Sequence, residues 1–120
     1  RAVPIMEGIV TNSGYEEAAV NIPNNGFIKD LPDWIVVEIP AKVTAKGVQG
    51  IEMHLPKGIK GLLTNQIGVH EMTAEAILSQ SRDLVVQALL VDPVVTVSKS
   101  IPYLVDNMIA EQSPWLDYLR

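Results

Sequence analysis

The chain has 120 residues, no cysteine and a net charge of −5 at pH 7, with a sequence pI near 4.9. The lack of cysteine excludes disulfides, thiolate nucleophiles and cysteine-rich zinc sites, and it is typical of a cytoplasmic protein, which we expect here. Nine scattered Lys and Arg residues are too few for a nucleic-acid-binding face. No apolar run approaches the roughly 20 residues that span a bilayer, so no membrane association is expected.

The length fits one domain over residues 1–120. Hydrophobic residues make up 48% of the chain and charged residues only 19%, and the mean hydropathy is +0.21. These values lie at the apolar end for a soluble domain, so we expect other protein to cover part of the apolar surface. The chain also starts without a methionine inside an apolar helical pattern, which favours a fragment of a longer protein.

The first predicted element is a helix over residues 2–12. Apolar side chains recur there at helical spacing, and Asn12-Ser13-Gly14 supplies a stop signal. A short apolar run at 18–21 then predicts a strand. The segment Pro23-Asn24-Asn25-Gly26 predicts a tight turn, because proline fixes φ while asparagine and glycine tolerate positive φ.

The strongest strand signal covers residues 34–43. The β-branched run Ile35-Val36-Val37 predicts burial on both faces of this strand, and Pro40 predicts a bend or an edge. The segment Thr44-Ala45-Lys46-Gly47 predicts a turn into a second strand at 48–53. The two strands are therefore expected to form a hairpin.

After the second strand the apolar period becomes helical. Gly68 either divides this helical region into two helices or marks a close backbone contact. Ser81 predicts the cap of a further helix that ends at Asp92-Pro93, and a last helix is expected to begin around Ser100. The amphipathic tail 111–120 is predicted to dock on a neighbour. This order predicts an α+β fold of short antiparallel strands packed with helices.

The sequence carries no catalytic or metal-binding cluster. His54 and the adjacent pair His70-Glu71 lack the spacing of a metal-binding motif. Asp30 and Asp33 flank a Leu-Pro turn, where carboxylates are more often turn acceptors than an acid–base pair. There is no Gly-x-Gly-x-x-Gly or P-loop pattern. We therefore assign no catalytic, cofactor-binding or metal-binding residue.

Two side chains are candidates for the substrate side of a site. Glu38 lies in an otherwise apolar strand, where an acid costs free energy unless it is paired or solvated. It is either satisfied within the fold by an Arg or by backbone amides, or exposed on a half-buried strand, or part of a polar pocket that another domain completes. Asn25, like Asn21 and Asn24, is first a turn former and second a hydrogen-bonding group for a bound ligand.

The same region resembles a known family. Asn24-Asn25-Gly26, Leu31-Pro32-Asp33 and Val36-Val37-Glu38-Ile39-Pro40 are similar to the Asn-x-Gly, Leu-Pro-Asp and Val-Val-Glu-Val-Pro segments of the carboxyl-terminal part of glycoside hydrolase family 4. Further along, the family's Glu-Leu-Thr-Val-Glu-Ala, Asp-Arg-Asp and Ala-Leu…Asp-Pro segments have counterparts in Glu71 to Ala76, Ser81 to Asp83 and Ala88 to Pro93. Order and spacing agree over nearly the whole chain.

The resemblance implies the carboxyl-terminal fragment of a larger two-domain glycosidase, with an α+β lobe similar to the substrate-side lobe of lactate and malate dehydrogenases. In that family, NAD on an amino-terminal Rossmann domain takes a hydride from C3 of the sugar, and a divalent metal, typically manganese, polarises the C2 and C3 oxygens. The family's metal-binding Cys and the NAD fingerprint are absent from this sequence. NAD and Mn are therefore expected in the full-length enzyme and not on this fragment.

The resemblance further implies a sugar substrate and a homo-oligomer. It favours an α-glucosidase, α-galactosidase or α-galacturonidase over a phospho-glycosidase, and the fragment alone is expected to be inactive. The alternative is a free-standing, non-catalytic interaction or oligomerisation domain, which the lack of catalytic clusters also supports. A Gly-rich βαβ unit with Cys and His motifs upstream of Arg1 would favour the hydrolase, and a start codon close to Arg1 would favour the module.

Overall fold

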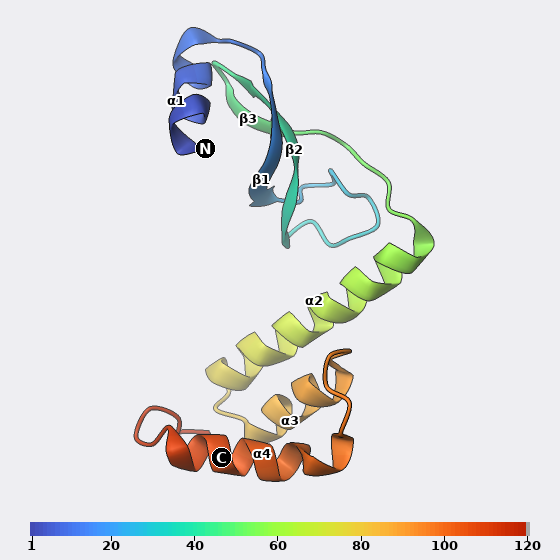
Figure 1. Cartoon of the computed structure of the whole chain (residues 1–120), viewed down its shortest axis with the longest axis vertical. Helices are drawn as coiled ribbons and strands as arrows, with labels where there is room; N and C mark the ends of the chain where they lie inside the picture. Colours follow the sequence, from blue (N-terminus) through green and yellow to red (C-terminus); the bar gives the residue numbers. More distant parts are fainter. Residues whose placement is uncertain (120) are drawn as a thin grey trace. The chain divides into compact units, whose positions relative to one another are not determined.

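The computed structural model describes residues 1–119, which form two compact units that meet in sequence at Lys60 and Gly61. The first unit contains helix α1 (Ala2–Thr11) and strands β1 (Glu16–Pro23), β2 (Val36–Thr44) and β3 (Gly47–Gly50). The elements that follow are helix α2 (Lys57–Leu78), α3 (Arg82–Val91), the 3₁₀ helix η1 (Ser98–Ser100) and α4 (Ile101–Glu111) (Figure 1). Helices and an antiparallel sheet confirm the predicted α+β class.

The sheet of the first unit is antiparallel and has the strand order β1-β2-β3. Strand β1 pairs with β2 from Glu16↔Lys42 to Pro23↔Val36, with a bulge between Glu17 and Val20. Strands β2 and β3 form the predicted hairpin, closed after the pair Thr44↔Gly47. Strand β3 is shorter than predicted, because Met53 forms only an isolated parallel bridge to Ile28.

Strand β2 alternates between buried and exposed side chains. Its buried residues are Val37, Ile39, Ala41 and Val43, whereas Val36 and Glu38 are exposed. The expectation that this strand is buried on both faces is therefore wrong. β-branched residues favour a strand whether or not their side chains are buried, so the Ile-Val-Val run predicts a strand but not which of its side chains are buried.

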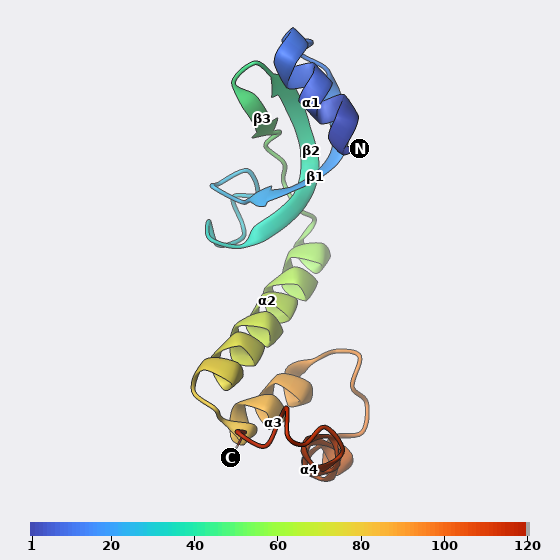
Figure 2. The ribbon, with the colours of Figure 1, turned by 90° about the vertical axis from the view of Figure 1, so that its left-hand side faces the viewer.

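Helix α1 packs against the sheet of the first unit (Figure 2). The close approach is possible because Gly8 has no side chain: an added Cβ would lie 3.0 Å from Val43 Cγ1 and 2.6 Å from Tyr15 Cε1. The helix ends at Thr11 and is capped by Asn12, whose φ of 52° is left-handed, as the stop signal predicted. Asn12 Oδ1 accepts a hydrogen bond from Ala45 N at 2.9 Å, which ties the end of the helix to the hairpin turn.

The second unit is helical. Helix α2 runs without interruption through Gly68, and no atom lies within 4 Å of a Cβ built there, so both interpretations of Gly68 are wrong. Ser81 Oγ caps α3 by accepting from Leu84 N at 3.3 Å, and α3 ends before Asp92-Pro93, as predicted. Helix α4 begins directly after Ser100. The buried apolar residues of this unit are Val69, Ala76, Ala88, Ile101 and Val105.

An ion pair joins α3 to α4. Arg82 Nε donates to Asp106 Oδ1 at 2.6 Å, and Arg82 Nη2 donates to the Pro102 carbonyl at 3.3 Å. The hydrogen bond from Arg82 lowers the pKa of the Asp106 carboxyl below its usual value. The pair therefore supports the contact between α3 and α4 wherever Asp106 is ionised.

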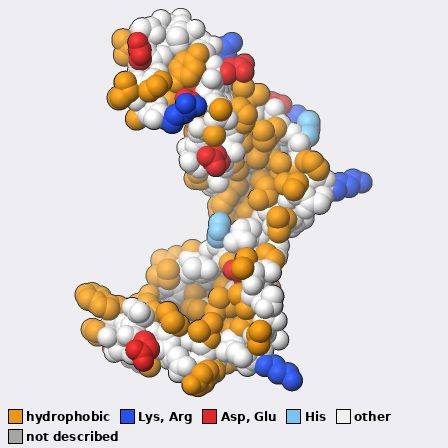
Figure 3. All heavy atoms as spheres, in the orientation of Figure 1, with side chains coloured by type: hydrophobic (Ala, Val, Ile, Leu, Met, Phe, Trp, Pro, Cys, Tyr) orange, Lys and Arg blue, Asp and Glu red, His pale blue; other side chains and the backbone are white. Residues whose placement is uncertain are grey.

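Large apolar side chains are exposed on both units (Figure 3). In the tail, Trp115 is exposed, while Leu116 and Leu119 line an apolar groove of about 290 Å³ with residues of α3 and α4. Docking of the tail on a neighbour stays a prediction. None of the helices described over residues 1–119 is both long and apolar enough to cross a membrane.

Two glycine substitutions test this packing. We expect Gly50→Ala to destabilise the protein by about 1–3 kcal/mol through overpacking, because the new Cβ would lie 2.7 Å from Ile39 Cδ1 and 2.8 Å from Phe27 Cδ2. Gly68→Ala is the control, and it should stabilise the protein by up to about 1 kcal/mol, because alanine favours a helix and the space is open. The free energy of unfolding in urea measures both. Equal effects of the two changes would contradict the packing described.

Candidate functional site

The loop between β1 and β2 carries the Asn-Asn-Gly and Leu-Pro-Asp segments and is organised by Asn24. The Asn24 side chain is fully buried, with 0% of its surface exposed. Its Nδ2 donates to the carbonyl oxygens of Ile28 and Leu31 at 3.0 Å and of Pro32 at 3.1 Å. Its Oδ1 accepts from Ile28 N at 2.7 Å. One side chain thus holds three positions of the loop from inside.

Backbone hydrogen bonds close the same loop. Asn24 N donates to Ile35 O at 2.8 Å, and Asn25 N donates to Asp33 O at 3.1 Å. Met53 N donates to Phe27 O at 2.8 Å, which attaches the loop to the segment after β3. The prediction of a turn is confirmed. The sequence identified the asparagines as turn formers but did not single out Asn24, whose partners lie up to eight residues away.

Asn25 lies on the surface of this fixed loop. It is exposed and has a φ of 44°, a left-handed conformation that asparagine tolerates. With the apolar residues Ile22 and Phe27 it lines a groove of about 370 Å³. The groove is also lined by residues of the β2–β3 hairpin, which include Thr44, Lys46 and Gln49. Apolar residues with a few hydrogen-bonding groups are the usual composition of a small-molecule site.

Glu38 lies on the exposed face of β2, in register with Asn21 of β1. Among the described residues no Arg and no backbone amide pairs with Glu38, so the structure argues against the first of the three alternatives, and the wall of a pocket completed by another domain stays a prediction. Glu38 is not among the residues that line the groove beside Asn25. The groove therefore contains only one of the two candidate residues, and a contact of either with substrate stays a prediction.

Of the remaining acids of the loop, Asp30 has a side-chain partner, and Asp33 takes part in the loop through its backbone. Lys60 Nζ donates to Asp30 Oδ1 at 2.9 Å and ties the loop to the first turn of α2. This hydrogen bond, with the charge of Lys60, lowers the pKa of the Asp30 carboxyl. The backbone carbonyl of Asp33 accepts the hydrogen bond from Asn25. Neither contact brings these two carboxylates together as an acid–base pair.

Glu17 is a buried acid that the sequence did not identify. It is 2% exposed and accepts hydrogen bonds from Tyr15 Oη at 3.3 Å and from Ala18 N at 3.1 Å, and it forms an ion pair with Arg1. Loss of water contact, followed by the charge of Glu17, raises the pKa of the Tyr15 hydroxyl. Because these partners satisfy the carboxylate, Glu17 has a structural explanation next to the bulge of β1.

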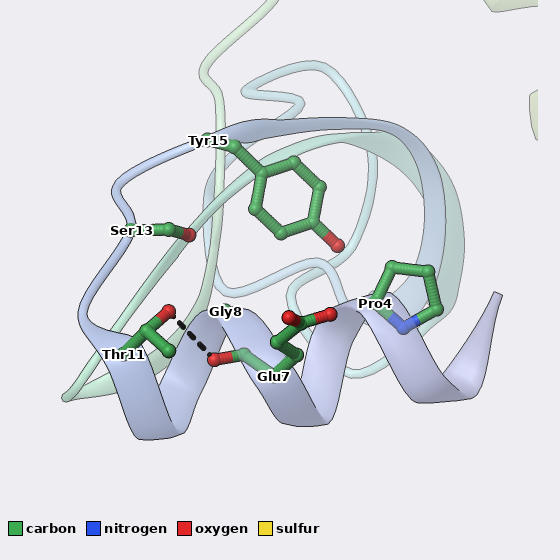
Figure 4. A pocket seen from close by; sticks show the side chains of 6 residues that line it. All are labelled: Pro4, Glu7, Gly8, Thr11, Ser13 and Tyr15. Carbon is green, nitrogen blue, oxygen red and sulfur yellow. Dashed lines mark hydrogen bonds between the residues drawn. The ribbon is translucent and has the colours of Figure 1, made fainter.

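A hollow of about 280 Å³ lies beside α1 (Figure 4). Ser13 and Tyr15 face the helix across it, with Gly8 at its base. Its polar lining includes Glu7 and Thr11, and Thr11 Oγ1 donates to the Glu7 carbonyl at 2.8 Å. The hollow therefore combines an aromatic ring with a rim of hydroxyl and carboxylate groups.

The described residues do not fit a metal or NAD site. Over residues 1–119 no three His, Asp or Glu side chains group together in a way that could hold a metal ion. The sequence contains neither a cysteine nor a Gly-x-Gly-x-x-Gly segment. We place neither group in this part of the chain.

Known proteins match both the sequence and the fold. Residues 1–95 match the family model described as the family 4 glycosyl hydrolase C-terminal domain. An alpha-glucosidase from Erwinia rhapontici is 63% identical over 120 residues, which cover 100% of this chain and 26% of that protein.

Solved structures of glycosidases have a similar fold over nearly the whole of this chain. A 6-phospho-alpha-glucosidase from gut microorganisms, in complex with NAD and glucose-6-phosphate, has a TM-score of 0.77 and 28% identity over 98% of this chain and 26% of its own. A 6-phospho-beta glucosidase from Thermotoga maritima, with manganese, NAD+ and glucose-6-phosphate, has a TM-score of 0.78 and 25% identity over 99% of this chain and 30% of its own. The chain thus spans between a quarter and a third of the length of these relatives.

The role of Asn24 is testable by substitution. Asn24→Ala removes four hydrogen bonds from a fully buried position, so we expect a loss of at least about 2 kcal/mol in the free energy of unfolding, since each buried polar group left unsatisfied costs about 1–3 kcal/mol. Asn21→Ala, on an exposed position of β1, is the control and should change stability by less than about 0.5 kcal/mol. Urea unfolding measures both. Similar losses for the two variants would show that Asn24 does not organise the loop.

Proposed function

The chain belongs to glycosyl hydrolase family 4 as its carboxyl-terminal domain, and we propose that it forms the substrate-side and oligomerisation part of a full-length glycosidase. The observation that carries the proposal is the 63% identity to an alpha-glucosidase over the whole of this chain. The proposed reaction is hydrolysis of an O-glycosidic bond by NAD-dependent redox elimination with a divalent metal. NAD and manganese accompany the solved Thermotoga maritima relative, which supports these cofactors for the full-length enzyme.

The proposed organisation is a two-domain protein in which residues 1–120 form the carboxyl-terminal domain. Its partner is an amino-terminal Rossmann domain of the same polypeptide, which supplies the NAD and metal sites. The greater length of the relatives supports this organisation. We further propose that the full-length protein is a homo-oligomer and that it is located in the cytoplasm.

Within this proposal Asn25 forms part of the rim of the sugar cleft. The hydrogen bonds of Asn24 fix the loop, so the Asn25 side chain is presented from a rigid support rather than from a mobile loop. Phe27 and Ile22 offer apolar surface to a sugar ring, while Thr44 and Gln49 offer hydrogen bonds to its hydroxyl groups. Glu38 contributes from the exposed face of β2, where another domain completes the pocket wall.

We propose an unphosphorylated α-glycoside as the substrate. The relative at 63% identity is named an alpha-glucosidase, whereas the two solved relatives named as phospho-glucosidases are 28% and 25% identical. A higher identity over the substrate-side domain favours the α-glucoside, with an α-galactoside or α-galacturonide next in order.

The proposal that catalysis requires protein outside residues 1–120 is tested by comparing the full-length protein with these residues alone. We expect the full-length protein, with NAD and manganese, to release p-nitrophenol from p-nitrophenyl α-glucoside, and residues 1–120 alone to release none, because the catalytic groups lie outside them. Absorbance of p-nitrophenol measures both, and p-nitrophenyl α-galactoside and a 6-phosphorylated α-glucoside serve as alternative substrates. Release by residues 1–120 alone would refute this proposal. A full-length protein inactive on all three would favour the non-catalytic interaction domain.

The two candidate residues are tested in the full-length enzyme. Asn25→Gly removes the side chain and keeps the left-handed backbone accessible, and Glu38→Ala removes the carboxylate. Each should raise KM by roughly 2- to 10-fold with little change in kcat, as expected for the loss of one hydrogen bond worth about 0.5–1.5 kcal/mol to a bound sugar. Lys42→Gln, also exposed on β2, is the control and should leave KM unchanged. A wild-type KM in both variants would show that neither residue contacts the substrate.

A further inference from the structure

Helix α1 exposes an apolar stripe on its outer face. The stripe consists of Val3, Met6 and Val10, whose side chains are 68%, 57% and 85% exposed. Positions three and four residues apart lie on one side of a helix, so these three side chains form a continuous row. Gly8, on another side of the helix, is buried towards the sheet. Apolar groups therefore occupy both the inner and the outer side of α1.

The composition of α1 shows that the stripe is not an ordinary solvent face. Glu7 and Thr11 are the only polar residues between Ala2 and Thr11. A surface helix of a globular protein normally places charged and polar residues opposite its apolar face, and a helix that is apolar all round is normally buried. Helix α1 thus has the composition of a helix that is covered on two sides. Among the described residues, the sheet covers its inner side, and the outer side is exposed.

The hollow beside α1 extends this surface. It is lined by Pro4, Glu7 and Thr11 of the helix, which lie next to the stripe, and by Tyr15 across from them (Figure 4). Gly8 allows Tyr15 and Ser13 to pack close to the helix at the edge of this hollow: a Cβ there would lie 2.6 Å from Tyr15 Cε1 and 3.1 Å from Ser13 Oγ. Protruding apolar side chains beside a depression of about 280 Å³ are a surface shape that can be complementary to a second protein surface.

We propose that the outer face of α1, formed by Val3, Met6, Val10 and the adjoining hollow, is covered by the part of the full-length polypeptide outside residues 1–120. This interface rests on the proposed function, since it requires the longer protein. This chain corresponds to 26% of its alpha-glucosidase relative, so roughly three quarters of such a protein lies outside it. A surface in the same polypeptide reaches α1 at a high effective concentration and avoids the entropy lost when two molecules associate.

Photo-crosslinking of the full-length protein tests the interface. Met6 is replaced by the photoreactive residue p-benzoylphenylalanine, and crosslinked peptides are identified by mass spectrometry after irradiation. We expect crosslinks from position 6 to peptides outside residues 1–120, in a product that runs as a single chain on a denaturing gel. The same probe at Val94, which is 82% exposed in the second unit, gives the background. A probe at Val3 repeats the measurement should the Met6 variant not fold.

Two results would overturn the interface. A product of doubled mass from position 6 would show that a second copy covers α1, and crosslinks no more frequent than at Val94 would show that the face is free. Glycosidase activity of the unmodified full-length protein is measured separately. Intramolecular crosslinks in a protein without that activity would leave the interface standing and refute only the proposed function.

Discussion

The side-chain amide of Asn24 supplies the hydrogen bonds that make the connection between β1 and β2 a part of the core. It binds carbonyl groups of Ile28, Leu31 and Pro32 and the backbone N–H of Ile28 at a position with no exposure to solvent. Inside a protein such bonds are strong, and leaving their partners unpaired is costly. Ile28 and Leu31 are consequently buried although they belong to a loop. Everything presented on the outer side of the loop depends on this anchor.

That anchor connects the fold to the proposed activity. A residue that contacts a sugar must be held in position before the sugar arrives, because ordering a mobile loop on binding reduces affinity. Asn25 follows the buried residue directly, and Phe27, which lines the same groove, accepts a hydrogen bond from Met53. The domain therefore offers a rigid rim, while the described residues contain no metal-binding cluster. In the proposed function this rim positions a substrate for chemistry performed by another part of the enzyme.

Sequence reasoning succeeded where the signal was local. The stop at Asn12, the β2–β3 hairpin and the Ser81 cap each depend on neighbouring residues, and all three are found in the structure. It failed where the outcome depends on distant contacts. Whether Val36 is buried depends on what covers β2, and the burial of Glu17 depends on Arg1 and Tyr15. The family was identified from the order and spacing of short segments, two of which, Asn24-Asn25-Gly26 and Leu31-Pro32-Asp33, lie in the loop that Asn24 organises.

The bulge in β1 has a consequence for how this domain meets other proteins. In the order β1-β2-β3 the two outer strands are β1, which carries an irregularity between Glu17 and Val20, and β3, which has only four residues. The backbone N–H and C=O groups of an edge strand are unpaired, so a strand of another chain can add to the sheet there. Bulges and short edge strands disfavour this addition. Both outer strands of the sheet described over residues 1–119 therefore carry features that disfavour fibril-like extension.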